Sequence, residues 1–376
     1  MKPPFPFTAA ILVMGVGIVA AQPATAPAPA SAAGRATARP PAPVRDPLAP
    51  GYVKATELPD GQVPPVEADG NFIIGPTHKP APEMGPVAEG QPKGTVFKFT
   101  LSSTESQFYP GVARDESPVG AAPAGPNATV TNHPQPYKRT VSVYVPAQYV
   151  PGTVAPVMIT SDGDGRAFNV LDHLIPQKKL PVMIVVAIPP GGPDGRGGER
   201  NLEYDTVSGR YSDFVETEVL PMAEKVAHVK LTKDPDGRAV MGTSSGGAAG
   251  LSMAWFHPER YHRVFTFSGT FTNNQWPTDP ELPHGAWGLH ETLIPNSPVK
   301  PLRIYLEVGD RDNFSGPMRD WVEANEAMAR VLAAKGYHHY KFVFARGAGH
   351  TDRPTISQLY PTALQWIWRG YPIAGK

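Results

Sequence analysis

Cysteine is missing from this 376-residue chain, and neither sign of charge is in excess. The absence of cysteine excludes disulfides, cysteine nucleophiles and thiolate metal sites. It leaves the cellular compartment open, because exported proteins often carry disulfides but need not. Lys and Arg together number 34, and Asp and Glu together also number 34. This balance gives no indication of binding to nucleic acid or to an anionic membrane surface.

Beyond the first 21 residues, the sequence has no apolar run that is long enough to cross a bilayer. Lys2 precedes an apolar run over residues 9–19, which is too short to span a membrane comfortably. Small residues then stand before Gln22. This pattern predicts a secretory signal peptide over residues 1–21, and therefore a secreted or periplasmic protein. An uncleaved membrane anchor is the alternative interpretation.

Large apolar residues are also scarce in the segment that follows the predicted signal peptide. Residues 22–50 are rich in Ala and Pro and cannot bury enough surface to offset the entropy of ordering, which predicts a disordered linker. Residues 51–94 remain rich in Pro and Gly, and we expect an irregular extension in which residues 71–75 could dock on the main body. The ordered domain is expected over residues 95–372.

Strand and helix patterns alternate over that domain. Two segments alternate apolar and polar residues, and others are short, continuous apolar runs. The alternating segments are 96–101 and 139–145, and the continuous runs are 157–160, 182–188, 239–241, 264–267 and 304–308. Apolar stripes at helical spacing occupy 215–226 and 321–332. The patterns predict a mostly parallel, doubly wound α/β sheet with helices on both faces and antiparallel strands at its front edge.

The pentapeptide Gly242-Thr243-Ser244-Ser245-Gly246 matches the G-x-S-x-G pattern of a nucleophile elbow. Such a pattern alone describes many turns, because Gly and Ser are common in them. Here an apolar strand leads in and a helix of small residues leads out, which is the context that the motif requires. We therefore predict Ser244 as a catalytic nucleophile of an α/β-hydrolase.

A serine nucleophile needs a histidine base and an acid that orients it. Asp310 and Asp312 both follow the strand 304–308, and Asp312 is preferred because it lies at the tip of the loop. Asp310 and Glu307 remain alternatives, and the two aspartates could instead cap the next helix. His350 follows the strand 340–344 in a glycine-rich loop and is the predicted base, although it could be an ordinary loop histidine.

Two backbone N–H groups are needed for an oxyanion hole. We predict the amide of Ser245, directly after the nucleophile, and the amide of Asp164, in the loop after the strand 157–160. The pair Asp162 and Asp164 could also be half of a Ca²⁺ loop, but Arg166 stands where the next ligand would be. We therefore expect no metal and no cofactor.

Several stretches resemble the enterochelin-esterase-like branch of the α/β-hydrolase superfamily, which includes carbohydrate acetyl and feruloyl esterases and mycolyltransferases. The resemblance rests on the elbow, on Asp162-Gly163, on the segment 200–204 and on the segment 211–221. It implies that Arg200 and Glu203 support the site or contact substrate. The alternative is an exposed ion pair of little energetic value. The resemblance does not identify the substrate.

A long insert over residues 273–300 separates two predicted core strands. Inserts of this kind often roof a pocket, so Trp276, Trp287 and His290 could line one, or they could anchor the loop to the core. Together the motifs predict an exported serine carboxylic ester hydrolase that acts on a small-molecule ester. An acyltransferase with the same residues and a non-catalytic binding protein on the same fold are the alternatives.

Overall fold

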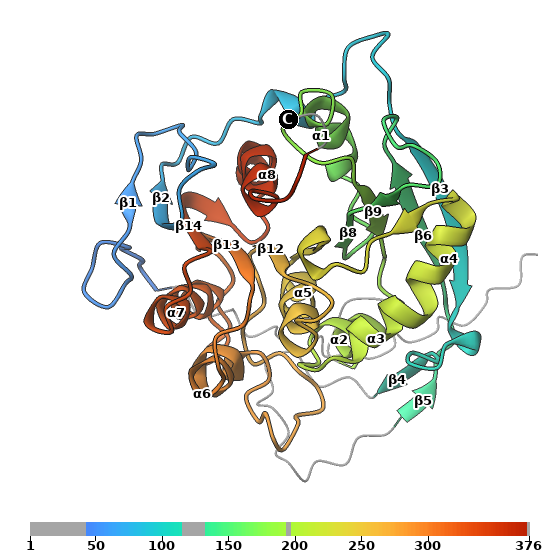
Figure 1. Cartoon of the computed structure of the whole chain (residues 1–376). Helices are drawn as coiled ribbons and strands as arrows, with labels where there is room; N and C mark the ends of the chain where they lie inside the picture. Colours follow the sequence, from blue (N-terminus) through green and yellow to red (C-terminus); the bar gives the residue numbers. More distant parts are fainter. Residues whose placement is uncertain (1–42, 115–131, 193–196, 374–376) are drawn as a thin grey trace, which may run out of the picture. The chain divides into compact units, whose positions relative to one another are not determined.

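The computed structural model describes residues 43–114, 132–192 and 197–373 (Figure 1). The predicted signal peptide and most of the predicted linker lie outside these residues. All the described residues belong to one compact unit of the chain. Within the described residues, no helix has the length and apolarity that crossing a membrane requires.

A ten-stranded sheet forms the centre of this unit. Its strands lie in the order β1 (Thr56–Glu57), β2 (Gly70–Ile74), β14 (Tyr340–Gly349), β13 (Arg303–Arg311), β12 (Arg263–Phe267), β11 (Arg238–Thr243), β8 (Val157–Thr160), β9 (Ile184–Ala187), β6 (Lys138–Val145) and β3 (Thr95–Ser102). All neighbours are parallel except the pairs that β6 makes with β3 and with β9. The predicted parallel sheet with antiparallel strands at one edge is therefore confirmed.

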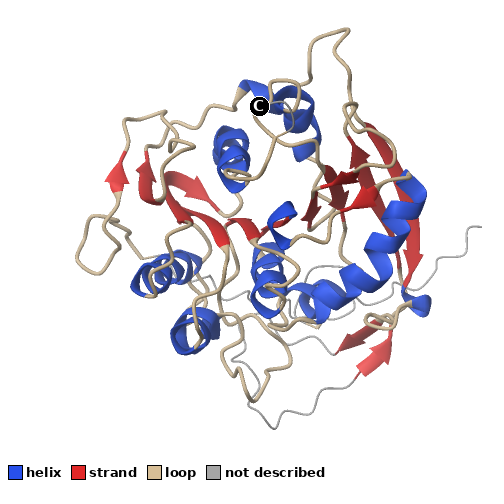
Figure 2. Ribbon diagram, viewed as in Figure 1, coloured by secondary structure: helices blue, strands red, loops and turns tan. Residues whose placement is uncertain are grey.

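Helices cover both faces of the sheet, as predicted (Figures 1 and 2). One face packs against α1 (Ala167–Leu174) and α8 (Arg353–Ile367), whose apolar residues share a core cluster with alternate residues of the strands. The other face packs against α3 (Arg210–Phe214), α4 (Leu220–Ala227), α5 (Ser245–Phe256) and α7 (Trp321–Ala334). The parallel strands are buried on both faces, which explains why their sequences read as continuous apolar runs.

The remaining elements are short. They are α2 (Glu199–Tyr204), α6 (Ile294–Asn296), a π-helical segment over Val215–Val219, a second at Leu289–Leu293, and the small sheets β4–β5 (Val112–Arg114, Asn132–Pro134) and β7–β10 (Val154–Ala155, Lys230–Leu231). Pro221 lies in the first turn of α4, directly after the π-helical segment that joins α3 to α4. The apolar stripe over 215–226 is thus shared between that π-helical segment and α4.

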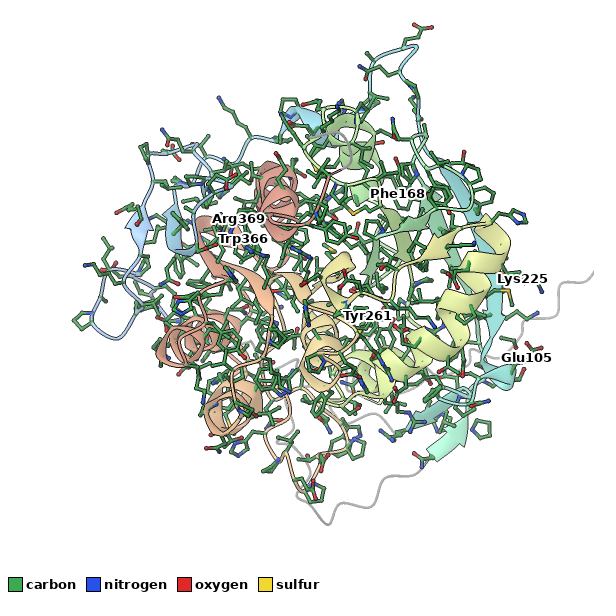
Figure 3. The ribbon with its side chains drawn as sticks, in the orientation of Figure 1. Glu105, Phe168, Lys225, Tyr261, Trp366 and Arg369 are labelled. Atoms are coloured by element: carbon green, nitrogen blue, oxygen red, sulfur yellow. The ribbon has the colours of Figure 1, made fainter. Side chains whose placement is uncertain are left out.

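Aromatic side chains are part of the core under α1 and α8, and Phe168 and Trp366 are labelled in Figure 3. Phe168 of α1 stacks on Tyr144 of β6, with ring centroids 4.9 Å apart. Trp366 of α8 is fully buried, and its indole N–H donates to Asp69 at 2.8 Å. Asp69 belongs to the segment for which the sequence predicts irregular structure, so α8 is tied directly to that segment.

The segment 51–94 is not merely an irregular extension. Its strand β2 pairs in parallel with β14, from Gly70 opposite Lys341 to Ile74 opposite Ala345. Ile73 and Ile74 are almost completely buried, so this short apolar run extends the sheet by an added strand. The apolar run 71–75 indicates docking on the main body, but composition cannot assign it a strand partner that lies near the other end of the chain.

Candidate active site

Ser244 lies at the turn between β11 and α5. Its backbone angles, φ 54° and ψ −129°, lie outside the regions that non-glycine residues usually adopt. The turn is tight: a Cβ atom on Gly242 would lie 2.1 Å from the carbonyl carbon of Gly246, and one on Gly246 would lie 2.1 Å from Ser161 Oγ. Glycine is therefore required at both positions. A strained residue held by such close packing is the geometry of a nucleophile elbow.

Ser244, His350 and Asp312 form a hydrogen-bonded row at the carboxyl ends of three parallel strands. His350 Nε2 lies 2.9 Å from Ser244 Oγ, and His350 Nδ1 lies 2.6 Å from Asp312 Oδ1. Ser244 follows β11, Asp312 follows β13 and His350 follows β14. Parallel strands end at the same edge of a sheet, so residues far apart in sequence meet there. The Asp312 side chain is fully buried, whereas that of His350 remains 24% exposed.

The two alternative acids have other partners. Asp310 Oδ1 accepts a hydrogen bond from the Gly347 amide at 2.9 Å, which holds together the loops after β13 and β14. Glu307 is buried within β13, where burial and the neighbouring carboxylates of Asp312 and Asp352 raise the pKa of its carboxyl well above the usual value. Among the described contacts, only Asp312 of these acids hydrogen-bonds to His350.

Thr270 and Trp321 also contact the row, and sequence reasoning did not single out either of them. Thr270 Oγ1 lies 3.2 Å from Ser244 Oγ and 3.0 Å from the Trp321 indole nitrogen. The Trp321 ring packs edge-on against the His350 ring, with centroids 5.8 Å apart. Thr270 is fully buried and Trp321 is 6% exposed. Neither residue belongs to a motif, so only the fold could place them here.

The predicted oxyanion donors differ in their availability. Ser245 is the first residue of α5, and the first N–H groups of a helix have no intrahelical acceptor, so this amide is a candidate donor beside Ser244. The amide of Asp164 is already committed, because it donates to the Ser161 carbonyl at 3.1 Å and closes a turn. The structure therefore contradicts the prediction for Asp164. Its carboxylate is paired with Arg166, 2.7 Å away.

Arg200 and Tyr204 of α2 hold Asp162 in the same loop. Arg200 Nε lies 2.8 Å from Asp162 Oδ1, and the Asp162 amide donates to the Tyr204 hydroxyl at 3.1 Å. Asp162 has a φ of 56°, a left-handed conformation that costs energy for a residue with a side chain. Each carboxylate of the Asp162 and Asp164 pair thus faces its own arginine, an arrangement unlike that of two ligands converging on one Ca²⁺ ion.

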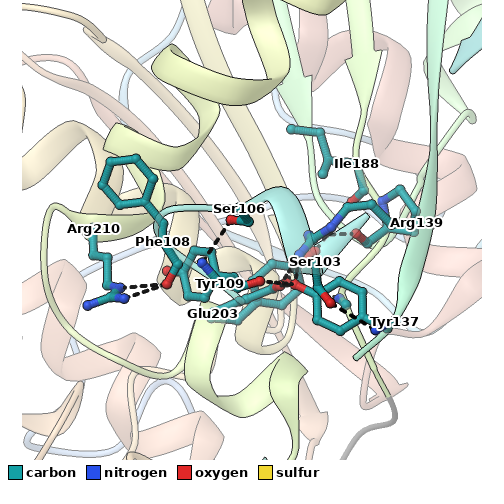
Figure 4. A network of polar contacts seen from close by, with 12 residues as sticks. Ser103, Ser106, Phe108, Tyr109, Tyr137, Arg139, Ile188, Glu203 and Arg210 are labelled. Carbon is teal, nitrogen blue, oxygen red and sulfur yellow. Dashed lines mark hydrogen bonds and ion pairs between the residues drawn. The ribbon is translucent and has the colours of Figure 1, made fainter. Parts of the chain in front are cut away.

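Glu203 of α2 belongs to a separate, buried network (Figure 4). Its carboxylate accepts from Arg139 Nη1 at 3.1 Å, from the Tyr137 hydroxyl at 3.0 Å and from the Gly191 amide at 3.2 Å. Although burial opposes it, the charge of Glu203 keeps the pKa of Arg139 above its ordinary value. Arg200 and Glu203 are therefore not an exposed ion pair: both are buried and each has a different partner.

Trp287 and His290 contact each other rather than the hydrogen-bonded row. Their ring centroids lie 4.6 Å apart, and Trp287 packs on the core cluster under α7. Burial, together with the nearby charge of Arg330, lowers the pKa of His290 to about 4. No described contact joins either residue to Ser244, so these positions fit the interpretation in which the insert is anchored to the core.

A doubly wound, mostly parallel sheet with a strand–turn–helix elbow at its centre defines the α/β-hydrolase class of fold. The chain belongs to the family described as "Putative esterase", whose model matches residues 135–365. The resemblance to enterochelin esterases is also borne out by a curated relative. The Iron(III) enterobactin esterase of Dickeya dadantii (strain 3937) is 32% identical over 145 residues, which are 35% of this chain and 30% of that protein.

Two solved structures are similar to this chain at low sequence identity. The ferulic acid esterase AmCE1/Fae1A of the anaerobic fungus Anaeromyces mucronatus superposes with a TM-score of 0.50 and 16% identity, over 77% of this chain and 96% of that one. The enterobactin esterase FES of Shigella flexneri gives a TM-score of 0.46 and 23% identity, over 61% of this chain and 55% of that one. The chain thus spans only part of the enterobactin esterases that it matches.

Proposed function

We propose that this chain is an exported serine carboxylic ester hydrolase that works through an acyl-enzyme, with Ser244 as nucleophile, His350 as general base and acid, and Asp312 as the residue that orients the imidazole. The observation that carries the proposal is the row Ser244–His350–Asp312, with contacts of 2.9 Å and 2.6 Å. Membership in an esterase family supports the same reaction class.

In the proposed acylation step, Ser244 Oγ attacks the ester carbonyl carbon and gives its proton to His350 Nε2. Asp312 accepts the hydrogen bond from the Nδ1–H group, which fixes the tautomer and stabilises the imidazolium ion. His350 then donates the proton to the leaving alcohol as the carbon–oxygen bond breaks. In deacylation a water molecule attacks the acyl-enzyme, with His350 again accepting and returning the proton.

The negative charge on the tetrahedral intermediate needs hydrogen-bond donors beside Ser244. We propose the Ser245 amide as one donor, because it begins a helix and the positive end of the helix dipole faces the same point. Arg200 and Tyr204 support the site indirectly, since they hold the Asp162 loop at the end of the neighbouring strand β8.

Export rests on the sequence pattern of residues 1–21, and we propose a secreted or periplasmic location on that basis. The substrate is proposed to be a small-molecule ester. Relatives named for enterobactin and ferulic acid esters make catecholate and feruloyl esters the first compounds to test, together with simple acetyl and butyryl esters.

The decisive experiment compares Ser244→Ala with wild type on a panel of chromogenic esters. We expect kcat to fall by roughly 10⁶-fold, the scale on which loss of a nucleophilic serine acts. Ser252→Ala is the matched control, because Ser252 is buried in α5, the helix that follows Ser244, and its hydroxyl has no hydrogen-bond partner among the described atoms. A fluorophosphonate probe should label wild type and Ser252→Ala but not Ser244→Ala. Equal labelling of all three would refute the proposal.

A further inference from the structure

The proposed reaction depends on which neighbour receives the hydroxyl proton of Ser244. Ser244 Oγ has two hydrogen-bonding neighbours, His350 Nε2 at 2.9 Å and Thr270 Oγ1 at 3.2 Å. A serine hydroxyl has a single proton to donate. The proposed reaction requires that proton to point at His350, whereas donation to Thr270 would leave the base without it. The Thr270 contact therefore decides whether the hydroxyl is ready to react.

Trp321 determines which way the Thr270 contact runs. An indole N–H can only donate, and it lies 3.0 Å from Thr270 Oγ1, so the threonine oxygen is the acceptor in that bond. The threonine proton must then go elsewhere. Among the described contacts, Ser244 Oγ is the only other group that Thr270 Oγ1 touches, and Thr270 is fully buried. A buried donor without an acceptor is costly, so the threonine donates to the serine.

The backbone fixes these groups in place. The Thr270 amide donates to the Ser244 carbonyl at 3.0 Å, which ties the loop after β12 to the elbow. Asn325 Nδ2 lies 2.8 Å from the Gly269 carbonyl and 2.8 Å from the Trp321 carbonyl, which ties the same loop to α7. The elbow, the loop after β12 and α7 thus hold Ser244, Thr270 and Trp321 next to one another.

We infer that Thr270 is a further catalytic residue and Trp321 its positioning residue, in a one-way chain of hydrogen bonds. The chain runs from the Trp321 N–H to Thr270 Oγ1, from the Thr270 O–H to Ser244 Oγ, and from the Ser244 O–H to His350 Nε2. This inference rests on the proposed function. As Ser244 Oγ bonds to the ester carbon, its proton moves to His350, while the threonine keeps its own proton and supports the oxygen that is losing one.

The test uses a set of variants of the full chain. Trp321→Phe removes the N–H but keeps an aromatic ring beside His350. Thr270→Ser keeps the hydroxyl, and Thr270→Val replaces it with a methyl group of similar shape. The fourth variant combines Trp321→Phe with Thr270→Val. The measurements are kcat and KM for p-nitrophenyl acetate over a range of pH, the rate of fluorophosphonate labelling, and thermal unfolding.

Trp321→Phe is expected to lower kcat and the labelling rate about fivefold to tenfold, the effect of one misdirected hydrogen bond, with KM and the pH dependence of kcat unchanged. Thr270→Val should show a loss of similar size, and Thr270→Ser should stay within about twofold of wild type. The double variant should be no slower than Thr270→Val alone, because without the threonine hydroxyl Trp321 has nothing to orient.

Where Trp321→Phe folds, either of two results would overturn the inference. One is wild-type kcat in folded Trp321→Phe, and the other is a double variant whose loss equals the product of the two single losses, which would mean that Trp321 acts only by packing on His350. If Trp321→Phe does not fold, the comparison of Thr270→Val with Thr270→Ser decides, and equal rates for these two overturn the inference. Ser244→Ala separates the failures, because full activity in that variant removes the proposed function itself.

Discussion

His350 Nδ1 lies 2.6 Å from Asp312 Oδ1, and the same buried oxygen also accepts a hydrogen bond from the Asn313 amide at 2.6 Å. The two bonds leave this oxygen little freedom to rotate away from the imidazole. Asp310, only two residues earlier, is bonded to the Gly347 amide instead. The local structure therefore distinguishes two aspartates that the sequence alone could only rank.

Asp312→Asn is expected to lower kcat by about 10³- to 10⁴-fold, because an amide in place of the carboxylate favours the wrong imidazole tautomer and does not stabilise the imidazolium ion. The measurement is kcat on a chromogenic acetyl ester, with thermal unfolding to verify the fold. Asp310→Asn is the matched control and should keep most of the activity, because its amide oxygen can still accept from Gly347. Equal losses in both variants would argue against Asp312 as the orienting acid.

The second prediction concerns Arg200. Arg200→Met should lower the free energy of unfolding by about 2 kcal/mol and reduce kcat/KM, because it removes the charged partner that holds Asp162 in its left-handed conformation. Arg166→Met is the control: its partner Asp164 belongs to the same loop, but the Arg166 side chain is 28% exposed. Urea unfolding and kcat/KM should separate the two variants, and indistinguishable results would remove any special role for Arg200.

The positions of the proposed catalytic residues can be predicted from short stretches of the sequence. Ser244, Asp312 and His350 each stand directly after a strand whose apolar run is visible, so their meeting edge could be predicted. Thr270 and Trp321 could not be, because both are ordinary residue types without a motif. The commitment of the Asp164 amide depends on how one turn closes, which composition does not specify.

The partners of the Arg200 and Glu203 side chains also could not be predicted from the sequence. Arg200 and Glu203 are three residues apart in a helix, a spacing that favours pairing with each other. The fold instead presents Asp162 to one and Arg139 to the other. These partners come from β6 and from the loop after β8, so their choice depends on how α2 packs over the sheet.

A third prediction concerns pH and stability. Lys341 of β14 is almost completely buried; its Nζ donates to the Pro65 carbonyl at 2.6 Å, and burial lowers the pKa of its ammonium group to about 7. In the unfolded chain a lysine titrates near 10.4. Between these two pH values the unfolded state therefore binds more protons than the folded state, so the lysine makes the free energy of unfolding rise with pH from about 7 to about 10.4. Below pH 7 the lysine is protonated in both states, and its cost to the free energy of unfolding no longer changes with pH.

Lys341→Met removes this contribution. The measurement is the free energy of unfolding of both proteins in urea at pH 6 and at pH 10. The difference between variant and wild type should favour the variant more at pH 6 than at pH 10. Lys98→Met, at an exposed position of β3, is the control, and its difference from wild type should be the same at both pH values. A Lys341→Met difference that does not change with pH would mean that this side chain does not lose its proton on folding.

The last prediction concerns where the folded unit begins. We propose that it starts before Thr95, because β2 pairs with β14, the Val53 amide donates to Glu326 of α7 at 2.6 Å, and Asp69 accepts from Trp366 of α8.

A chain that starts at Pro43 keeps all these contacts and should unfold at the wild-type temperature with wild-type kcat. A chain that starts at Thr95 exposes the edge of β14 and the core that Ile73 and Ile74 cover, so it should aggregate or unfold at a markedly lower temperature. A chain that starts at Gly51 is the intermediate case: it keeps β2 but loses the ion pair of Arg45 with the buried Asp320, and its loss of stability should be smaller than that of the chain that starts at Thr95. Identical unfolding of the chains that start at Pro43 and at Thr95 would show that β2 contributes nothing to the folded unit.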